Sequence, residues 1–200
     1  MNDEYVDRKR IAITALASCL LFFVLTGCGK KQPEQSVITF DKEGHILEYL
    51  VEDFPASQYD ETEWESEVKK GIDAYNKSGK GTIALSEVSL SDDVLRCLVD
   101  YDTDDSYFYL NNEPIFYGTV DQAYRAGYNM MIPLYDTKSK DALPAVRLKE
   151  MGESHIVIMD RQIDVRTYSK IRYASDNVTI DDDLKGAKIT GDNTAYIVFD

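Results

Sequence analysis

The sequence has few of the residue types that mark common chemical sites. It holds only three cysteines and two histidines in 200 residues, too few for a disulfide framework and a poor set for a zinc site. Cys97 lies in the apolar stretch LRCLVDY, which is typical of a buried, unreactive cysteine. No GxSxG motif is present. The residues therefore indicate no nucleophile with an adjacent base.

Basic residues are also scarce. Lys and Arg total 22 against 36 Asp and Glu, a formal net charge of -14, which argues against nucleic-acid binding because phosphates require a basic face. Five of the bases and four of the acids precede Val37, so residues 37–200 carry 17 bases and 32 acids, a net charge of -15. We expect such a region to avoid anionic surfaces and to favour cations or a basic protein partner. The same charge also serves solubility.

Long apolar runs are missing as well. The uncharged segment 11–27 has 17 residues, whereas a helix that spans a bilayer needs about 20. It follows the basic triplet at 8–10 and ends in small residues, which is the order found in a secretory signal peptide. An uncleaved anchor helix is the alternative.

The end of this segment carries a motif with chemical meaning. Leu25-Thr26-Gly27-Cys28 resembles the lipobox of bacterial lipoproteins, in which an aliphatic residue, a small residue and Gly or Ala precede Cys. The resemblance implies that signal peptidase II recognises Leu25, Thr26 and Gly27 and cuts before Cys28. It also implies that the Cys28 thiol carries a diacylglyceryl group, which anchors the protein to the outer face of the cytoplasmic membrane.

The chain divides into three parts on this interpretation. We expect a signal peptide at 1–27, a lipidated tether at 28–36 and a single extracytoplasmic domain at 37–200. Two small lobes, 37–119 and 120–200, are the alternative to a single domain. The tether is polar and contains a proline, so we expect it to hold the domain close to the bilayer.

The first half of the domain has clear local signals. Alternating apolar residues around a DKEG turn predict a hairpin over 37–51. A helix is predicted over 60–78, because acids fill its first turn, Gly79 follows its end and apolar residues recur on one face. That face holds Trp64, Val68, Ile72 and Tyr75. Strands are expected at 82–90 and 94–101, and the ββαββ order favours an α+β fold with an antiparallel sheet and a helix packed across one face.

The second half is expected to be rich in strands. Thr119 and Gln122 form a capping box that predicts a helix over 120–126, and a helical turn is expected within 143–151. A closing hairpin is predicted around Gly191. The other C-terminal strands are expected at 156–159, 165–173 and 178–180.

Several stretches of the chain resemble a known group of proteins. They are VEDF at 51–54, YDETEWESEV at 59–68, GTVDQAYRAGY at 118–128 and IRYASDNV at 171–178. Together they resemble small uncharacterised surface lipoproteins of Gram-positive, Clostridia-like bacteria. The resemblance implies one fold and a surface location, and it brings no activity, cofactor or catalytic residue.

An acidic stretch offers a candidate cation site. Asp102, Asp104 and Asp105 in DYDTDDS could give calcium the oxygen ligands that it prefers, although the EF-hand spacing is absent. A strand end followed by a solvated acidic turn explains the same residues.

Tyrosines follow this acidic stretch closely. Tyr107, Tyr109 and Tyr117 could form a surface that stacks on sugars or binds a cationic peptide. Ordinary packing within a sheet is the alternative. A binding surface requires these rings to be exposed, whereas packing within a sheet requires them to be buried.

The sequence as a whole predicts a membrane-anchored extracytoplasmic lipoprotein without a cofactor. Its expected role is that of a non-enzymatic binding or structural module of the cell envelope, with an unknown ligand. A carboxylate-dependent envelope hydrolase is the alternative, and it would need two acids that face each other across a cleft.

Overall fold

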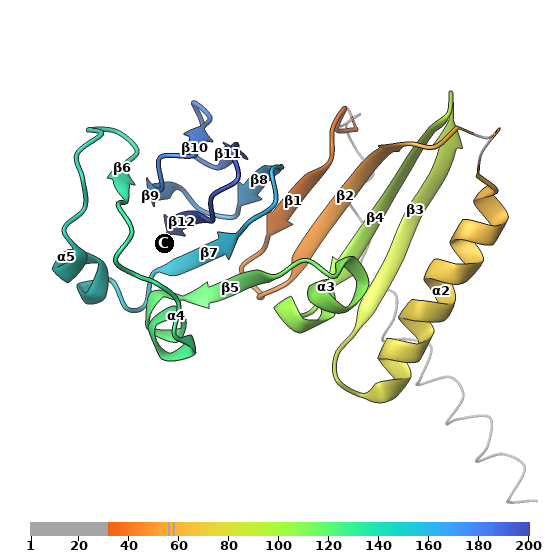
Figure 1. Ribbon diagram of the computed structural model, residues 1–200, viewed down its shortest axis with the longest axis horizontal. Helices are drawn as coiled ribbons and strands as arrows, with labels where there is room; N and C mark the ends of the chain where they lie inside the picture. The colour runs from red at the N-terminus through yellow and green to blue at the C-terminus, as the bar shows by residue number, and fades with distance from the viewer. Residues whose placement is uncertain (1–31, 56, 58) are drawn as a thin grey trace, which may run out of the picture. The chain divides into compact units, whose positions relative to one another are not determined.

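The computed structural model describes residues 32–55, 57 and 59–200 of the chain (Figure 1). The predicted signal peptide and Cys28 lie outside these residues, so the lipobox interpretation stays a prediction. Residues Pro33–Asp200 form one compact unit. The fold described below is the fold of that unit.

Within the described residues, the chain forms twelve strands in two sheets and four helices, which confirms the predicted α+β class. The helices are α2 (Glu61–Ser78), α3 (Asp104–Asn111), α4 (Val120–Ala126) and α5 (Ala145–Glu150). The first sheet holds, in spatial order, β10 (Val178–Ile180), β11 (Gly186–Ile189), β8 (Asp164–Thr167), β1 (Val37–Phe40), β2 (Ile46–Asp53), β4 (Val94–Tyr101) and β3 (Ile83–Ser91). The second sheet holds β5 (Ile115–Thr119), β7 (His155–Met159), β12 (Ala195–Phe199), β9 (Ile171–Ala174) and β6 (Tyr135–Asp136).

The predicted ββαββ unit supplies four of the seven strands of the first sheet. Strands β1 to β4 pair in antiparallel fashion in the order β1-β2-β4-β3, and α2 packs against them. One parallel pair extends this sheet: β1 lies beside β8, with Val37 opposite Asp164. The parallel pair attaches the C-terminal strands to the N-terminal ones, so this sheet is mixed.

The predicted closing hairpin around Gly191 is wrong. Strand β11 belongs to the first sheet, whereas β12 lies between β7 and β9 in the second. All five residues of β12 are buried, and a strand that is apolar on both faces belongs in the middle of a covered sheet. Gly191, at φ +78°, lies in the turn through which the chain crosses from one sheet to the other.

The chain also crosses between the sheets before this point. After β7 it returns to the first sheet for β8, joins the second for β9, and returns again for β10 and β11. Residues 120–200 therefore contribute strands to both sheets, and the sheets do not divide the chain at residue 119.

The predicted helix over 60–78 is confirmed as α2. The Asp60 side chain accepts a hydrogen bond from the Glu63 backbone N–H at 2.9 Å, and Gly79 ends the helix at φ +70°. Ile72 and Tyr75 are buried, while two further members of the stripe are half-buried against the same core. Helix α4 likewise has the predicted capping box. Local sequence signals specify both helices.

Helix α3 was not predicted. For DYDTDDS at 100–106 the sequence predicted a strand end with a solvated acidic turn or a calcium site, but Thr103 caps a helix by accepting a hydrogen bond from the Ser106 N–H. Asn112 ends it in the left-handed conformation. The aromatic run at 107–109 therefore lies on a helix and not in a sheet.

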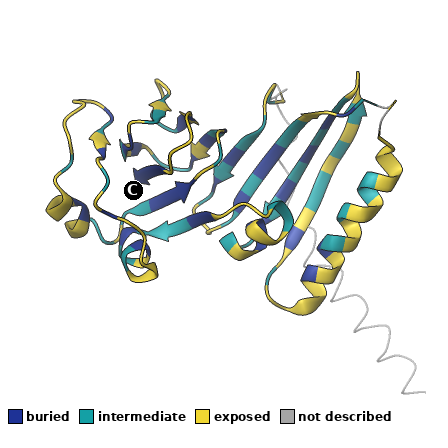
Figure 2. Cartoon of the chain, in the orientation of Figure 1, coloured by how far each residue is buried: buried dark blue, intermediate teal, exposed yellow. Residues whose placement is uncertain are grey.

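Two apolar cores hold the unit together. The larger draws side chains from both sheets and from α2 and α3, and the smaller lies between the second sheet and α4 and α5. Buried and less buried residues alternate along β4 (Figure 2), as a strand with one covered face requires. Cys97 is buried on this strand, and burial raises the pKa of its thiol to about 11, so the expected burial of this cysteine is confirmed.

Candidate functional site

The lipobox residues Leu25, Thr26, Gly27 and Cys28 precede the described part of the chain. The compact unit begins at Pro33, five residues after Cys28. In the part that the structure describes, no helix combines the length and the apolar character needed to cross a membrane.

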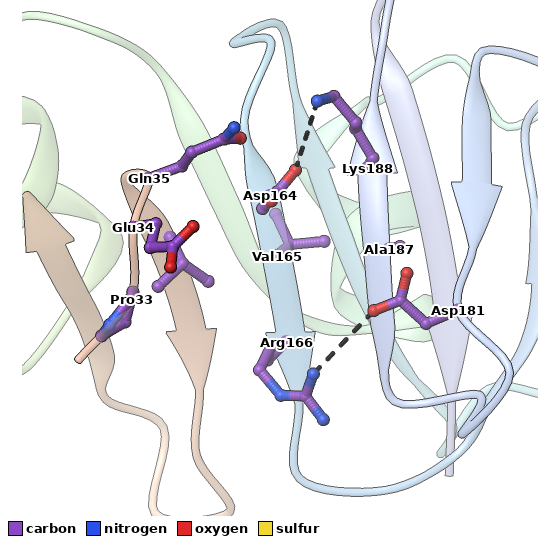
Figure 3. A pocket seen from close by; sticks show the side chains of 10 residues that line it. Pro33, Glu34, Gln35, Asp164, Val165, Arg166, Asp181, Ala187 and Lys188 are labelled. Carbon is purple, nitrogen blue, oxygen red and sulfur yellow. Dashed lines mark ion pairs between the residues drawn. The ribbon is translucent and has the colours of Figure 1, made fainter. Parts of the chain in front are cut away.

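An open groove borders the first residues of the compact unit (Figure 3). It encloses about 460 Å³, a volume typical of small-molecule sites. The segment 33–35 forms one wall, and strands β8 and β11 form the other. The lining residues are Pro33, Glu34, Gln35, Val37, Asp164, Val165, Arg166, Asp181, Ala187 and Lys188.

Charged side chains pair across the strands of this groove. Lys188 faces Asp164 across the β8–β11 pair, with Nζ and Oδ1 4.0 Å apart. Arg166 lies 3.9 Å from Asp181 and 2.5 Å from Asp183, measured between guanidinium nitrogens and carboxylate oxygens. These pairs are exposed to solvent, so each contributes little to stability and can exchange partners easily. The groove thus offers both donors and acceptors to a polar ligand, with three acidic and two basic side chains along its lining.

A second set of charges is buried inside the domain. The Glu48 side chain is only 3% exposed, and its Oε1 accepts a hydrogen bond from Arg161 Nη1 at 2.5 Å. Tyr101 donates its hydroxyl to Glu48 Oε2 at 3.0 Å, and Arg161 also donates to the Tyr107 hydroxyl at 2.8 Å. On the outer side, Arg161 Nε lies 3.4 Å from Glu113. We call these five residues the buried charge cluster.

The buried charge cluster ties five segments together. It joins β2, β4, α3, the segment between α3 and β5 that holds Glu113, and the loop after β7. That loop holds Arg161 and leads from the second sheet to the first. Burial, followed by the negative charge of Glu48, raises the pKa of Tyr101 and Tyr107, so both hydroxyls keep their protons. Through these hydrogen bonds and ion pairs, the arrangement is suited to holding the sheets in register.

The three tyrosine candidates do not share a surface. Tyr107 is fully buried and belongs to the charge cluster. Tyr109 is half exposed, and its ring packs 4.6 Å from that of Tyr75 on α2. Tyr117 is half-buried and donates its hydroxyl to the Asp41 carbonyl. Each ring has a packing partner inside the domain, so a common ligand-binding face of these three residues does not form.

The calcium candidates are engaged in local structure. Asp102 accepts hydrogen bonds from the Thr82 N–H at 2.7 Å and the Ser106 hydroxyl at 2.5 Å. Burial opposes its ionisation, but these bonds together hold the pKa of Asp102 below its usual value. Asp104 and Asp105 lie in the first turn of α3, where acids complement the helix dipole. Among the described residues, no group of three or more His, Cys, Asp or Glu side chains could hold a metal ion.

The two histidines lie in different surroundings. His45 Nδ1 lies 2.8 Å from Asp100, and His155 Nδ1 lies 2.9 Å from the Tyr168 hydroxyl. His155 also stacks on Phe199, and burial lowers its pKa. Neither interaction pairs a histidine with a serine or cysteine nucleophile.

Sequence reasoning missed the buried charge cluster, although one signal was available. Glu48 lies between Ile46 and Leu50, so strand alternation assigns it to the apolar face of β2. A charge at such a position must find a buried partner. The partner, Arg161, is 113 residues away, and no local pattern points to it.

The chain has no match among the family models, the curated proteins or the solved structures with which it was compared.

Proposed function

We propose that the protein is a lipid-anchored, extracytoplasmic module of the cell envelope, with a non-enzymatic binding or structural role on the outer face of the cytoplasmic membrane. The observation that carries this proposal is the sequence Leu25-Thr26-Gly27-Cys28 at the end of an apolar segment with a basic flank. Cysteine is required at the last position because its thiol is the group that would carry the lipid.

The chemistry of the anchor explains why it would last. Each buried methylene contributes about 0.8 kcal/mol, so one acyl chain binds only marginally, whereas two chains bind stably. A diacylglyceryl group on Cys28 would meet this requirement. Lys30 and Lys31 would lie near the headgroups and add a small attraction to an anionic leaflet.

The position of the groove supports a role at the membrane surface. Five residues from Cys28 to Pro33 span at most about 17 Å when extended. The groove starts at Pro33, so its ligand would be held close to the bilayer. The net charge of -15 over residues 37–200 keeps the domain from lying flat on anionic lipid.

A binding role accounts for the groove better than hydrolysis does. A carboxylate-dependent hydrolase needs a protonated carboxyl group as acid and a second, ionised one as base, both facing the substrate. In the groove, Asp164 and Asp181 lie within ion-pair distance of Lys188 and Arg166. Inside the domain, Glu48 is enclosed by Arg161 and Tyr101 and cannot reach a substrate.

The proposal is tested by replacing the lipidated residue. In a Gram-positive host grown with a clickable fatty acid, the wild-type chain should take up the label, shorten on processing and stay in the membrane fraction. Cys28→Ala should lose the label and keep its full length. Cys19→Ala is the matched control, because it changes the same residue type within the segment that is removed, and it should behave as wild type. Labelling and processing of Cys28→Ala at the wild-type level would refute the proposal.

A further inference from the structure

A concave surface lies where α2 begins, distant in sequence from the proposed anchor at Cys28. It encloses about 320 Å³. Three aromatic and three acidic side chains form its walls. They are Phe54, Tyr59, Trp64, Asp60, Glu63 and Glu67, and we call this surface the aromatic–acidic pocket.

The three rings of this pocket form a floor and two sides. Phe54 is the floor: it is only 7% exposed, and its backbone N–H donates to the Asp93 carbonyl at 2.6 Å. The Tyr59 ring lies 5.2 Å from Phe54 between centroids, and the Trp64 ring meets Phe54 edge-on at 6.1 Å. Tyr59 is 55% exposed. Aromatic surface therefore remains open to solvent around a fixed base.

The acids line one face of the helix start. Asp60, Glu63, Trp64 and Glu67 follow the spacing i, i+3, i+4 and i+7, which places them on one side of α2. Asp60 is engaged in capping through the Glu63 N–H. Glu67 lies 2.5 Å from Lys70, but both of these side chains are well exposed to solvent, so that pair exchanges readily. Glu63 and Glu67 can both turn toward a ligand.

The placement of these two acids lowers the stability of α2 when no ligand is bound. Glu63 and Glu67 are four residues apart on one helix face, and like charges at this spacing destabilise a helix. A cation between them would remove that repulsion and would also lie against the ring faces, which attract positive charge. A neutral sugar would gain only stacking, and an anion would be repelled. The pocket therefore selects for a cation that also has an apolar body.

We propose that the aromatic–acidic pocket binds a lysine or arginine side chain from a basic peptide segment of a partner protein. The charge of the domain supports this class of partner, because a net charge of -15 over residues 37–200 attracts a basic chain from a distance. Lys and Arg both pair a cationic head with an apolar stem, which suits the three rings. The inference deepens the proposed binding module and rests on that proposal for the setting in which the partner is met.

The pocket contains its own reporter, because Trp64 is the only tryptophan of the chain. The full chain in a non-ionic detergent is titrated with penta-lysine, and Trp64 fluorescence should change to a saturating value. The affinity should fall as salt is added, because exposed charges are screened. Penta-glutamate and penta-serine should give no change at the same concentrations.

Two double variants separate pocket chemistry from general charge. Glu63→Gln with Glu67→Gln should weaken penta-lysine binding by about tenfold, because two charge contacts are removed. Glu61→Gln with Glu65→Gln is the matched control, since it removes the same charge from the same helix outside the pocket. Each pair of substitutions also removes one exposed Glu–Lys ion pair of α2. The control should stay within about twofold of wild type.

A third variant addresses the rings. Tyr59→Ala should weaken binding by about threefold through the lost cation–π contact, while the melting temperature stays unchanged because this side chain is largely exposed.

Three results would overturn the inference. They are an unchanged Trp64 signal with penta-lysine, an equal loss of affinity in both double variants, and equal binding of penta-serine. Labelling of Cys28 is a separate measurement. Peptide binding without labelling would reject the anchor alone, and labelling without peptide binding would reject the pocket alone.

Discussion

Two ion pairs of this domain have the same length and opposite surroundings. Arg161 and Glu48 lie 2.5 Å apart in the core, with side chains 21% and 3% exposed. Arg166, which lines the groove, also lies 2.5 Å from Asp183, and these side chains are 46% and 50% exposed. Distance is therefore not what distinguishes them. The solvent around each pair decides what it contributes.

This difference assigns the two pairs to different tasks. A buried pair loses its hydration, and removing one partner leaves the other as an uncompensated charge in an apolar medium. An exposed pair keeps water within reach, so either partner can turn to a ligand at little cost. We infer that the buried charge cluster serves the fold, whereas the groove charges are available for binding.

The largest effect is expected from breaking the buried pair. Arg161→Ala should lower the free energy of unfolding by about 3–5 kcal/mol, because Glu48 then remains buried without its partner. Urea unfolding followed by circular dichroism measures this loss. Arg166→Ala is the surface control, and it should cost less than about 1 kcal/mol.

Apolar replacement gives a second test of the same pair. Glu48→Leu combined with Arg161→Met removes both charges at similar volume and should recover part of the stability lost in Arg161→Ala, because no unpaired charge remains. The recovery is partial because the buried Tyr101 and Tyr107 hydroxyls lose the partners that Glu48 and Arg161 gave them. The comparison would fail if Arg161→Ala and Arg166→Ala unfolded at the same urea concentration. It would also fail if the double variant were no more stable than Arg161→Ala.

A smaller effect is expected from a single hydroxyl of the buried charge cluster. Tyr101→Phe removes the donor to Glu48 and one of the two acceptors of the Asn111 amide, which also donates to the Tyr107 carbonyl. We expect a loss of about 1.5–3 kcal/mol, the range for hydrogen bonds to charged groups. Tyr109→Phe is the control: its ring contact with Tyr75 is kept, so its urea midpoint should match wild type. Equal midpoints for the two variants would show that the Tyr101 hydroxyl adds no stability.

Local signals explain which parts of the fold could be predicted. Asp60, Gly79 and an apolar stripe mark α2 within twenty residues of one another, and Thr119 with Gln122 marks α4. Each signal acts through hydrogen bonds or contacts inside the same segment, so it can be read without knowing the rest of the chain.

The missed elements depend on distant partners. Helix α3 contains Tyr-Phe-Tyr, residues that favour strands, but Thr103 caps it and burial of Tyr107 against Arg161 holds it in place. The β1–β8 pair joins Val37 to Asp164, and the turn at Gly191 changes sheets. Tertiary packing overrides local preference at these positions.

The candidate sites divide in the same way. Cys28 was predicted from a compact motif, whereas the groove joins segments near residues 34, 165 and 187. Only part of the aromatic–acidic pocket could be predicted from the sequence: Trp64 and the acids near the start of α2 were assigned to a helix. Its floor, Phe54, directly follows β2, and only the fold places it under Trp64.

The smallest effect is expected in the titration of Asp183, the partner of Arg166. The backbone N–H of Lys185, the Arg166 guanidinium and the backbone N–H of Gly186 together hold the pKa of Asp183 at about 2, below the usual 3.8. A carboxyl with a lowered pKa in the folded state adds stability above the unfolded value. That contribution is lost as the pH falls through the interval from 3.8 to 2.

Carboxyl NMR titration of the wild type and of Arg166→Ala measures this pKa directly. Arg166→Ala should raise the pKa of Asp183 and still leave it below 3.8, because the two backbone donors remain. A pKa of 3.8 in the variant would assign the whole shift to the ion pair. The exposed pair would then have a strong electrostatic effect despite the solvent around it, which would contradict the distinction drawn between exposed and buried pairs. A partial rise would show that the two backbone donors of the turn keep the pKa of Asp183 low without the Arg166 charge.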